Sequence, residues 1–188
     1  MSIALPTRSN AAVLFLDLQE EIVKNDRTVP LNRLRSRATA LAKLAALHGL
    51  PAFASSVPPG GEYLSDVLAP LPGLSPRPRT QTTAFADAGL VEALTASGRS
   101  ILVLSGVASE IVVQRTALDA LAAGFGVQVA VDACGGIDAR SEEAAWRRIV
   151  QAGGVTTSAV TFGAELAGDF TSELGGRTLG IVYETLAA

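Results

Sequence analysis

The fold of this chain is decided by residues 101–117, which read Ile101-Leu102-Val103-Leu104-Ser105-Gly106-Val107-Ala108-Ser109-Glu110-Ile111-Val112-Val113-Gln114-Arg115-Thr116-Ala117. The segment begins with the apolar run Ile101–Leu104 and opens an amphipathic stretch that ends near Gly124. This order predicts a buried strand, a tight turn and a helix, with Ser109 as the N-cap and Val112 in the first helical turn. Such a strand–helix unit is the building block of an α/β fold.

Apolar runs alternate with helical patterns along most of the chain, which is typical of repeated strand–helix units around a parallel sheet. We predict strands at residues 11–16, 51–57, 101–104, 126–131 and 155–157. We predict helices at residues 31–47, 63–69, 109–123, 141–152 and 161–167, and another from an Asp87 cap to Ser97. The Pro-rich segment 70–78 is expected to be irregular, and the tail after Asp169 shows no clear pattern. The sequence therefore predicts a three-layer, doubly wound α/β fold, in which a mostly parallel sheet has helices on both faces.

The composition is typical of one soluble globular domain over residues 1–188. Hydrophobic residues make up 48% of the chain, which is ample material for a buried core. The net charge is −3 and no long basic block occurs, which argues against nucleic acid or an anionic membrane as a partner. No apolar run approaches the roughly 18 residues of a membrane-spanning helix, and residues 1–10 lack a signal-peptide core. We therefore expect a cytoplasmic protein.

The chain has a single cysteine, Cys134, and a single histidine, His48. One cysteine excludes an internal disulfide and a cysteine cluster for zinc, so we expect no metal and no cofactor. Cys134 lies beyond a predicted strand and could serve as a nucleophile, but a small buried thiol is the favoured interpretation. His48 lies at a predicted helix end, where an imidazolium suits the helix dipole, and no catalytic role is assigned to it.

Polar groups follow several predicted strands. Asp17, the Gly106–Ser109 turn and Asp132 each come directly after an apolar run. In open parallel sheets, ligands bind outside the carboxyl ends of the strands, where the strand order reverses. We therefore expect these three positions to lie along one edge of the sheet, around a small-molecule site.

The segment 106–117 resembles the nucleophile region of the isochorismatase-like hydrolase superfamily, also called the cysteine hydrolases. Their pattern at this point is roughly G-x-x-T-[DE]-x-C-V-x-x-T-A, in which the Cys is the nucleophile. The residues that match the pattern are Gly106, Glu110, Val113, Thr116 and Ala117. Ser109 stands in place of the Thr, and Val112 occupies the place of the Cys. A thiol there would be activated by the positive end of the helix dipole, whereas an isopropyl group can neither ionise nor attack a carbonyl. The resemblance therefore implies a family member without its usual nucleophile.

The resemblance extends from about residue 11 to 169 and implies roles for other residues. The apolar run 12–16 followed by Asp17-Leu18-Gln19 is similar to the family's strand and D-x-Q motif, in which the Asp is the general acid or base. Gln19 would then lie behind the site or contact substrate. The family's basic catalytic residue, an Arg in one subgroup, precedes a small-plus-aromatic pair, which here is Ala84-Phe85. Both Arg77 and Arg79 are placed to fill it. A cation beside Asp17 would hold it ionised and stabilise developing negative charge.

Three further positions take a role from the resemblance. Phe85 would line the pocket, although core packing is the simpler interpretation. The Ala108–Ser109 peptide, a non-proline cis bond in the family, would line the polar end of the site. The D-x-H arrangement of metal-binding, nicotinamidase-like members has no counterpart in this sequence.

Two functions follow as hypotheses. The first is a hydrolase of a small molecule, cleaving a vinyl ether, amide or related C–N or C–O bond, in which Asp17 handles protons without a Cys nucleophile and Arg77 or Arg79 holds an anionic group. The second is a catalytically inactive family member that binds a small anion or acts in assembly. Lyase or isomerase chemistry on the same scaffold has no positive feature in its favour. The resemblance also implies a homo-oligomer.

Overall fold

The structure is a computed structural model that describes residues 5–186, so the outermost residues of the predicted 1–188 domain lie outside it. Within this range the chain forms a six-stranded sheet of order β3-β2-β1-β4-β5-β6, and each neighbouring pair is parallel. The strands are β1 (Ala11–Leu16), β2 (Ala52–Ser56), β3 (Arg77–Pro78), β4 (Ile101–Val107), β5 (Gly126–Gly135) and β6 (Val155–Thr157). The chain runs outward from β1 in one direction and then, from β4, in the other. The strand order therefore reverses between β1 and β4, which is where such sheets bind ligands.

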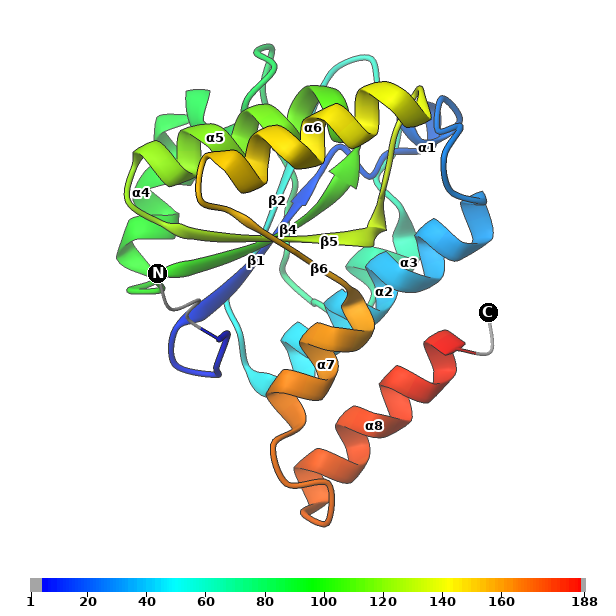
Figure 1. The fold of residues 1–188 in the computed structure, drawn as a ribbon, viewed down its shortest axis with the longest axis vertical. Coiled ribbons are helices and arrows are strands. Elements are labelled where there is room, and N and C mark those ends of the chain that lie inside the picture. The colour runs from blue at the N-terminus through cyan, green and yellow to red at the C-terminus, as the bar shows by residue number, and fades with distance from the viewer. Residues whose placement is uncertain (1–4, 187–188) are drawn as a thin grey trace.

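Helices cover both faces of the sheet, as Figure 1 shows. On one face lie α4 (Ala88–Ala96), α5 (Gln114–Ala122) and α6 (Ala139–Gln151). On the other lie α2 (Leu31–His48), α7 (Ala159–Ala167) and α8 (Glu173–Leu186). Short helical segments complete the chain: α1 (Glu20–Val23), α3 (Ser65–Leu68), a 3-10 turn at Ala84–Ala86 and a π-helical turn at Ser109–Val113. The predicted three-layer, doubly wound fold is confirmed.

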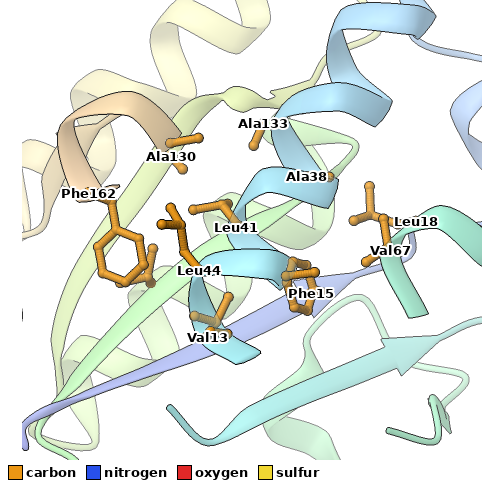
Figure 2. Packing of buried hydrophobic residues seen from close by; sticks show 14 of the residues in the cluster. Val13, Phe15, Leu18, Ala38, Leu41, Leu44, Val67, Ala130, Ala133 and Phe162 are labelled. Atoms are coloured by element: carbon orange, nitrogen blue, oxygen red, sulfur yellow. The ribbon is translucent and has the colours of Figure 1, made fainter. Parts of the chain in front are cut away.

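The core consists of two layers separated by the sheet. Along β1, the side chains of Ala11, Val13 and Phe15 join the cluster under α2 and α7, and the alternate residues of β1 join the cluster under α4, α5 and α6. Figure 2 shows Val13 and Phe15 against the α2 side chains, with Phe162 of α7 beside them. Because a central parallel strand is buried on both faces, its sequence is continuously apolar rather than alternating. This explains why β1 and β4 could be located from sequence.

One strand differs from its prediction in a way that affects the site. β5 continues to Gly135, four residues past its predicted end, because its pairing with β4 shifts register between Leu104 and Gly106. Asp132 therefore lies within a strand and not at a strand end, so its predicted place at the ligand edge is wrong. Its carboxylate accepts a hydrogen bond from the Ala159 N–H at 2.8 Å and lies 3.7 Å from Arg37 Nε. Asp132 joins β5 to α2 and α7.

Other differences are local. Ser109 is not an N-cap: the segment starts as a π-helical turn, the cap position is Ala108, and the Ser109 hydroxyl donates to Glu142 Oε1 at 2.7 Å. The Pro-rich segment ends in the two-residue strand β3, whose residues pair with β2. The tail contains α8, which packs on α2 and α7. Its sequence includes Gly175, Gly176 and Gly180, which disfavour a helix in isolation.

Two helix predictions are confirmed at their ends. The Asp87 carboxylate accepts hydrogen bonds from the N–H groups of Gly89 and Leu90, at 3.0 and 3.2 Å, and so caps α4. Gly49 ends α2 in the left-handed conformation, φ 64°. No helix in the described part of the chain is long and apolar enough to cross a membrane.

Candidate active site

Asp17 lies directly after β1, at the point where the strand order reverses. Its N–H still donates to the Ser55 carbonyl at 3.0 Å, as a further step of the β1–β2 ladder. Its φ is +53°, a left-handed conformation that Asp and Asn adopt more readily than most residues. The strand therefore ends at Asp17, where the backbone turns sharply at the carboxyl edge of the sheet.

Arg79 holds the Asp17 carboxylate in a bidentate ion pair. Arg79 Nη1 donates to Asp17 Oδ1 at 2.6 Å, and Nη2 donates to Oδ2 at 2.7 Å. Nη1 also donates to Ser55 Oγ at 2.9 Å, while Nε has no partner among the described residues. Asp17 is 4% exposed and Arg79 is 5% exposed, so the pair is buried. Parallel N–H···O bonds of this kind fix orientation as well as charge.

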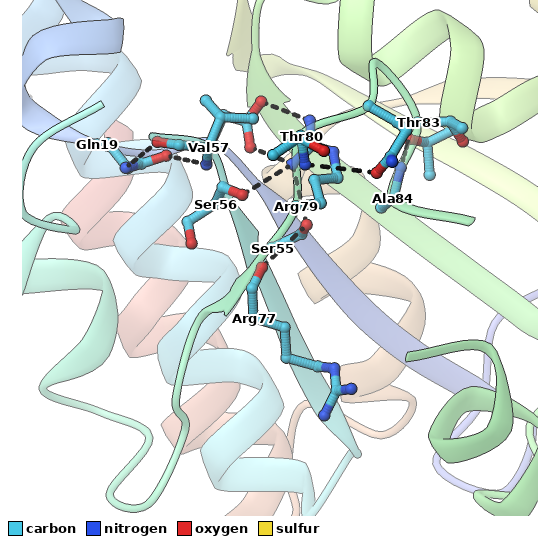
Figure 3. Close-up of polar contacts among 12 residues, drawn as sticks. Gln19, Ser55, Ser56, Val57, Arg77, Arg79, Thr80, Thr83 and Ala84 are labelled. Carbon is cyan, nitrogen blue, oxygen red and sulfur yellow. Dashed lines mark hydrogen bonds and ion pairs between the residues drawn. The ribbon is translucent and has the colours of Figure 1, made fainter. Parts of the chain in front are cut away.

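Arg77 lies elsewhere, although it is only two residues away in the sequence. Its guanidinium is exposed and binds Asp87, the cap of α4, with Nε–Oδ2 at 2.6 Å and Nη2–Oδ1 at 3.0 Å. Figure 3 shows its side chain directed away from Arg79. Of the two arginines that the sequence left open, the structure brings Arg79 to Asp17.

A cavity of about 430 Å³ opens beside this ion pair. Asp17, Arg79, Ala108 and Val112 are among the residues that line it. Val112 belongs to the π-helical turn after β4 and is 2% exposed. The other apolar side chains of the wall are Ile22, Val57, Val107, Ile111 and Ile137. The geometry therefore places an acid–arginine pair and an aliphatic side chain on the same small cavity.

Three residues predicted to bind substrate are absent from the residues that line this cavity. The Gln19 amide donates to the carbonyls of Val57 and Gly61 and accepts from the Val57 N–H, so it holds the loop after β2 (Figure 3). Phe85 packs edge-to-face on Phe125, with ring centroids 6.0 Å apart. Ser109 is fully buried and binds Glu142. Gln19 still positions part of the cavity wall, because it hydrogen-bonds the main chain of Val57 and Val57 lines the cavity.

The cis peptide bond is one residue earlier than expected. It joins Val107 to Ala108, whereas the resemblance implied Ala108–Ser109. Both Val107 and Ala108 line the cavity. β4 extends to Val107, so the cis bond directly follows the last residue of the strand.

Burial raises the pKa of both Asp17 and Cys134, but only Asp17 lines the cavity. Burial raises the pKa of the Asp17 carboxyl above its ordinary value, and the hydrogen bonds and charge of Arg79 only partly oppose this. Cys134 is fully buried within β5, and burial raises the pKa of its thiol far above the usual range. A neutral thiol without access to the cavity is a poor nucleophile. Cys134 therefore has the properties of a structural residue.

The remaining candidates for acid–base or metal chemistry are not at the cavity. His48 is buried, its Nε2 lies 2.8 Å from Thr178 Oγ1, and burial lowers its pKa. Across residues 5–186, no group of three or more His, Cys, Asp or Glu side chains is placed to hold a metal ion.

Sequence reasoning missed the polar residues at the rim. Asn25 and Arg27 come from the loop after α1, and Thr80, Gln81 and Thr82 follow Arg79. Neither loop has hydrophobic periodicity or a recognisable motif, so the sequence offered no signal beyond their position after a strand or beside a candidate residue.

A doubly wound parallel sheet with a buried acid–arginine pair beside a cavity at its reversal point defines an α/β protein with a candidate site at that point. Residues 11–160 match the family model of the isochorismatase domain, and the chain belongs to the isochorismatase family. It is 28% identical over 173 residues to Escherichia coli "Probable hydrolase YcaC", covering 90% of this chain and 83% of that protein.

Two solved structures are similar over nearly the whole chain. YcaC from Pseudomonas aeruginosa, solved with hexane-2,5-diol and covalent acrylamide, superposes with a TM-score of 0.92 at 27% identity, covering 100% of this chain and 96% of that one. YcaC from Escherichia coli, described as an octameric hydrolase of unknown specificity, gives a TM-score of 0.91 at 25% identity, covering 98% and 92%. The Escherichia coli relative is thus described as a hydrolase in both comparisons.

Proposed function

We propose that this chain hydrolyses a C–N or C–O bond of a small molecule by acid–base chemistry at Asp17, without a covalent intermediate. The observation that carries the proposal is the Asp17–Arg79 pair in the wall of the cavity. A carboxyl with a raised pKa, fixed in orientation and facing a small cavity, is suited to exchange protons with a bound molecule.

Position 112 supports the absence of a covalent step. Val112 is where the family pattern has its Cys, and it lies in the first turn after β4, on the cavity wall. The covalent acrylamide in the Pseudomonas aeruginosa relative is consistent with a reactive group in that protein. In this chain no cysteine lines the cavity within the described residues. The nucleophile of the proposed reaction is therefore water.

The steps follow from the groups present. Ionised Asp17 accepts a proton from a water molecule as the water oxygen attacks the substrate carbon. The same proton then passes to the leaving nitrogen or oxygen as its bond to carbon breaks, and Asp17 is regenerated. Arg79 keeps the carboxylate aimed at the cavity through both transfers. For a vinyl ether, protonated Asp17 first donates its proton to the alkene carbon, and water then adds to the resulting cation and loses a proton to Asp17. Asp17 returns that proton to the leaving oxygen of the hemiketal as its C–O bond breaks. The remaining hydroxyl loses its proton to Asp17 and becomes the carbonyl, so protonated Asp17 is regenerated.

Turnover by wild type and Asp17→Asn on one panel tests the proposal. The panel consists of isochorismate, small amides, carbamoyl compounds and simple esters. We expect wild-type activity that falls by about 10²–10⁴-fold in Asp17→Asn, the usual contribution of a general acid or base. Cys134→Ser is the matched control and should keep full activity. An Asp17→Asn variant with unchanged turnover would refute the proposal.

A second candidate is an inactive family member that binds a small molecule. It is favoured by the fact that both Asp17 oxygens already accept hydrogen bonds from Arg79, which leaves the carboxylate less free to take a proton from water. It predicts thermal-shift stabilisation by small carboxylates with no turnover on any panel compound.

We also propose that the chain acts as a homo-oligomer in the cytoplasm. Support comes from the Escherichia coli relative, which is described as octameric. Light scattering on the purified protein tests the oligomeric state, and a monomer at micromolar concentration would contradict the proposed homo-oligomer.

A further inference from the structure

We propose that Arg27 selects the ligand of this cavity by binding the carboxylate of a small monoanion with a compact apolar body. This assignment rests on the proposed function, because it names the substrate class of the same site. It replaces the role that the sequence gave to Arg77 or Arg79, since the charge of each is already paired with an aspartate.

The charges of the cavity wall lead to Arg27. Three charged residues line the cavity: Asp17, Arg79 and Arg27. The first two neutralise each other, and both terminal nitrogens of Arg79 are occupied by Asp17. The remaining polar side chains of the wall, Asn25, Thr80, Gln81 and Thr82, are uncharged. The lining therefore carries one net positive charge, and that charge is on Arg27.

The guanidinium of Arg27 is available to a ligand. It is exposed, and its Nη1 donates to two main-chain carbonyls, of Lys24 at 2.7 Å and of Asp26 at 2.8 Å. Among residues 5–186 it has no ion pair with a carboxylate, unlike Arg77 and Arg79. The carbonyl contacts orient the group without neutralising it.

The loop that carries Arg27 is held against the end of β5. The Arg27 N–H donates to the Gly136 carbonyl at 2.7 Å, and the Gly136 N–H donates to Thr28 Oγ1 at 2.8 Å. Asp26 Oδ1 accepts from the N–H of Thr28 at 2.9 Å, whereas Oδ2 is buried without a hydrogen-bond partner among the described residues. A Cβ at Gly135 would lie 2.5 Å from the Asp26 carboxyl, so the loop can only approach a glycine. The guanidinium is therefore positioned before a ligand arrives, which reduces the entropy lost on binding.

The rest of the wall describes the body of the ligand. Ile22, Ile111, Ile137 and Val112 are aliphatic, and Ile111 and Ile137 are 45% and 46% exposed, unusually high for isoleucine. An apolar group placed against them would remove this surface from water. A single carboxylate matches the single unpaired cation, whereas a dianion would leave one charge uncompensated in an apolar setting. The cavity volume limits the ligand to a small molecule.

Calorimetric titration with benzoate and its neutral counterpart benzamide tests the assignment without depending on turnover. The proteins are wild type, Arg27→Gln, Arg27→Lys and Arg33→Gln. Arg33 is exposed on α2 outside the cavity, so its variant removes the same charge at a distance. We expect Arg27→Gln to bind benzoate roughly tenfold more weakly, the size of a charge-assisted hydrogen bond. Arg27→Lys should recover part of the loss, and Arg33→Gln should bind as wild type. Benzamide should bind all four proteins equally, and added salt should weaken only benzoate binding.

Equal benzoate binding by wild type and Arg27→Gln would overturn the assignment. So would a wild-type protein that does not bind benzoate, or an equal loss of benzamide binding in Arg27→Gln. The proposed function fails separately. Arg27-dependent benzoate binding without turnover of any panel compound leaves the binding role standing and removes the catalytic one. Turnover that depends on Asp17 but not on Arg27 would support the catalytic role of Asp17 and overturn the binding role of Arg27.

Discussion

Two arginine–aspartate pairs, formed by arginines two residues apart in the chain, behave in opposite ways. Arg77 binds Asp87 at the surface, and its hydrogen bonds lower the pKa of that carboxyl below its ordinary value. Arg79 binds Asp17 in a bidentate pair as well, through Nη1 and Nη2 where Arg77 uses Nε and Nη2. The pKa of Asp17 is nevertheless raised, because burial outweighs the arginine. Both pairs join an arginine to an aspartate, but water reaches the Arg77 pair and is excluded from the Arg79 pair. The carboxylate of the exposed pair caps a helix, whereas the carboxyl of the buried pair has a raised pKa and lines the cavity.

A thiol placed beside the buried pair should give the largest change. Val112→Cys puts a cysteine in the first helical turn, near Asp17, where a thiolate is favoured. We expect acrylamide to add to this cysteine, giving one adduct per chain. The folded wild type, whose single thiol is buried, should stay unlabelled. Mass spectrometry of the intact protein and its peptides measures this.

The same experiment separates the two pairs. If Asp17 accepts the thiol proton, Asp17→Asn in the Val112→Cys background should slow labelling, whereas Asp87→Asn should not. Equal labelling rates in both double variants would show that the buried carboxyl does not act as a base toward position 112.

Removing each arginine compares the structural weight of the pairs. Arg79→Ala leaves a buried carboxylate without its partner, so we expect the free energy of unfolding to fall by about 3–5 kcal/mol. Arg77→Ala removes a solvent-screened ion pair and should change it far less. Urea denaturation at neutral pH measures both. Similar midpoints for the two variants would mean that burial does not distinguish the pairs.

The pH dependence of turnover should follow the buried pair. If ionised Asp17 is the base, activity falls about tenfold for each pH unit below its pKa, with a midpoint above the ordinary 3.8 because that pKa is raised. Asp87→Asn should leave the midpoint unchanged. A midpoint at or below 3.8 in the kcat/KM profile would contradict a raised pKa for Asp17.

The exposed pair should affect stability through its cap. Asp87→Ala removes the acceptor for the N–H groups of Gly89 and Leu90 and should cost about 1 kcal/mol. Because the folded pKa of Asp87 is lowered, its ionised form stabilises the fold. That contribution is present above the unfolded-state pKa and disappears as the pH falls through the lowered folded pKa. Thermal unfolding of both proteins should therefore show a larger difference at neutral pH than at strongly acidic pH.

The sequence predicted what depends on local pattern. Continuous apolar runs located β1 and β4, and Asp87 and Gly49 marked helix ends, so the layered fold followed. The register shift that carries β5 through Asp132 could not be foreseen, because it depends on pairing with β4. The helix α8 contains glycines and forms through contacts with α2 and α7, which local propensity does not include.

The candidate site was predictable only in part, for the same reason. Asp17 and Val112 were placed by a strand end and a family pattern, and both line the cavity. The choice between Arg77 and Arg79 depends on which carboxylate each one reaches across the sheet, and spacing along the chain does not contain that information. Arg27 was missed because its loop has no pattern, and its position becomes informative only when the loop is seen against Gly135 and Gly136.

The left-handed backbone at Asp17 also determines which substitutions at this position should still allow the chain to fold. Asn and Gly accept this conformation readily, so these variants should fold and report on the missing carboxylate alone. Val, Ile and Thr are disfavoured there by their branched Cβ, so their losses combine backbone and chemistry. Glu keeps the acid but not the backbone preference. A full scan of this one residue, read for soluble yield and for turnover, would separate its architectural role from its chemical one.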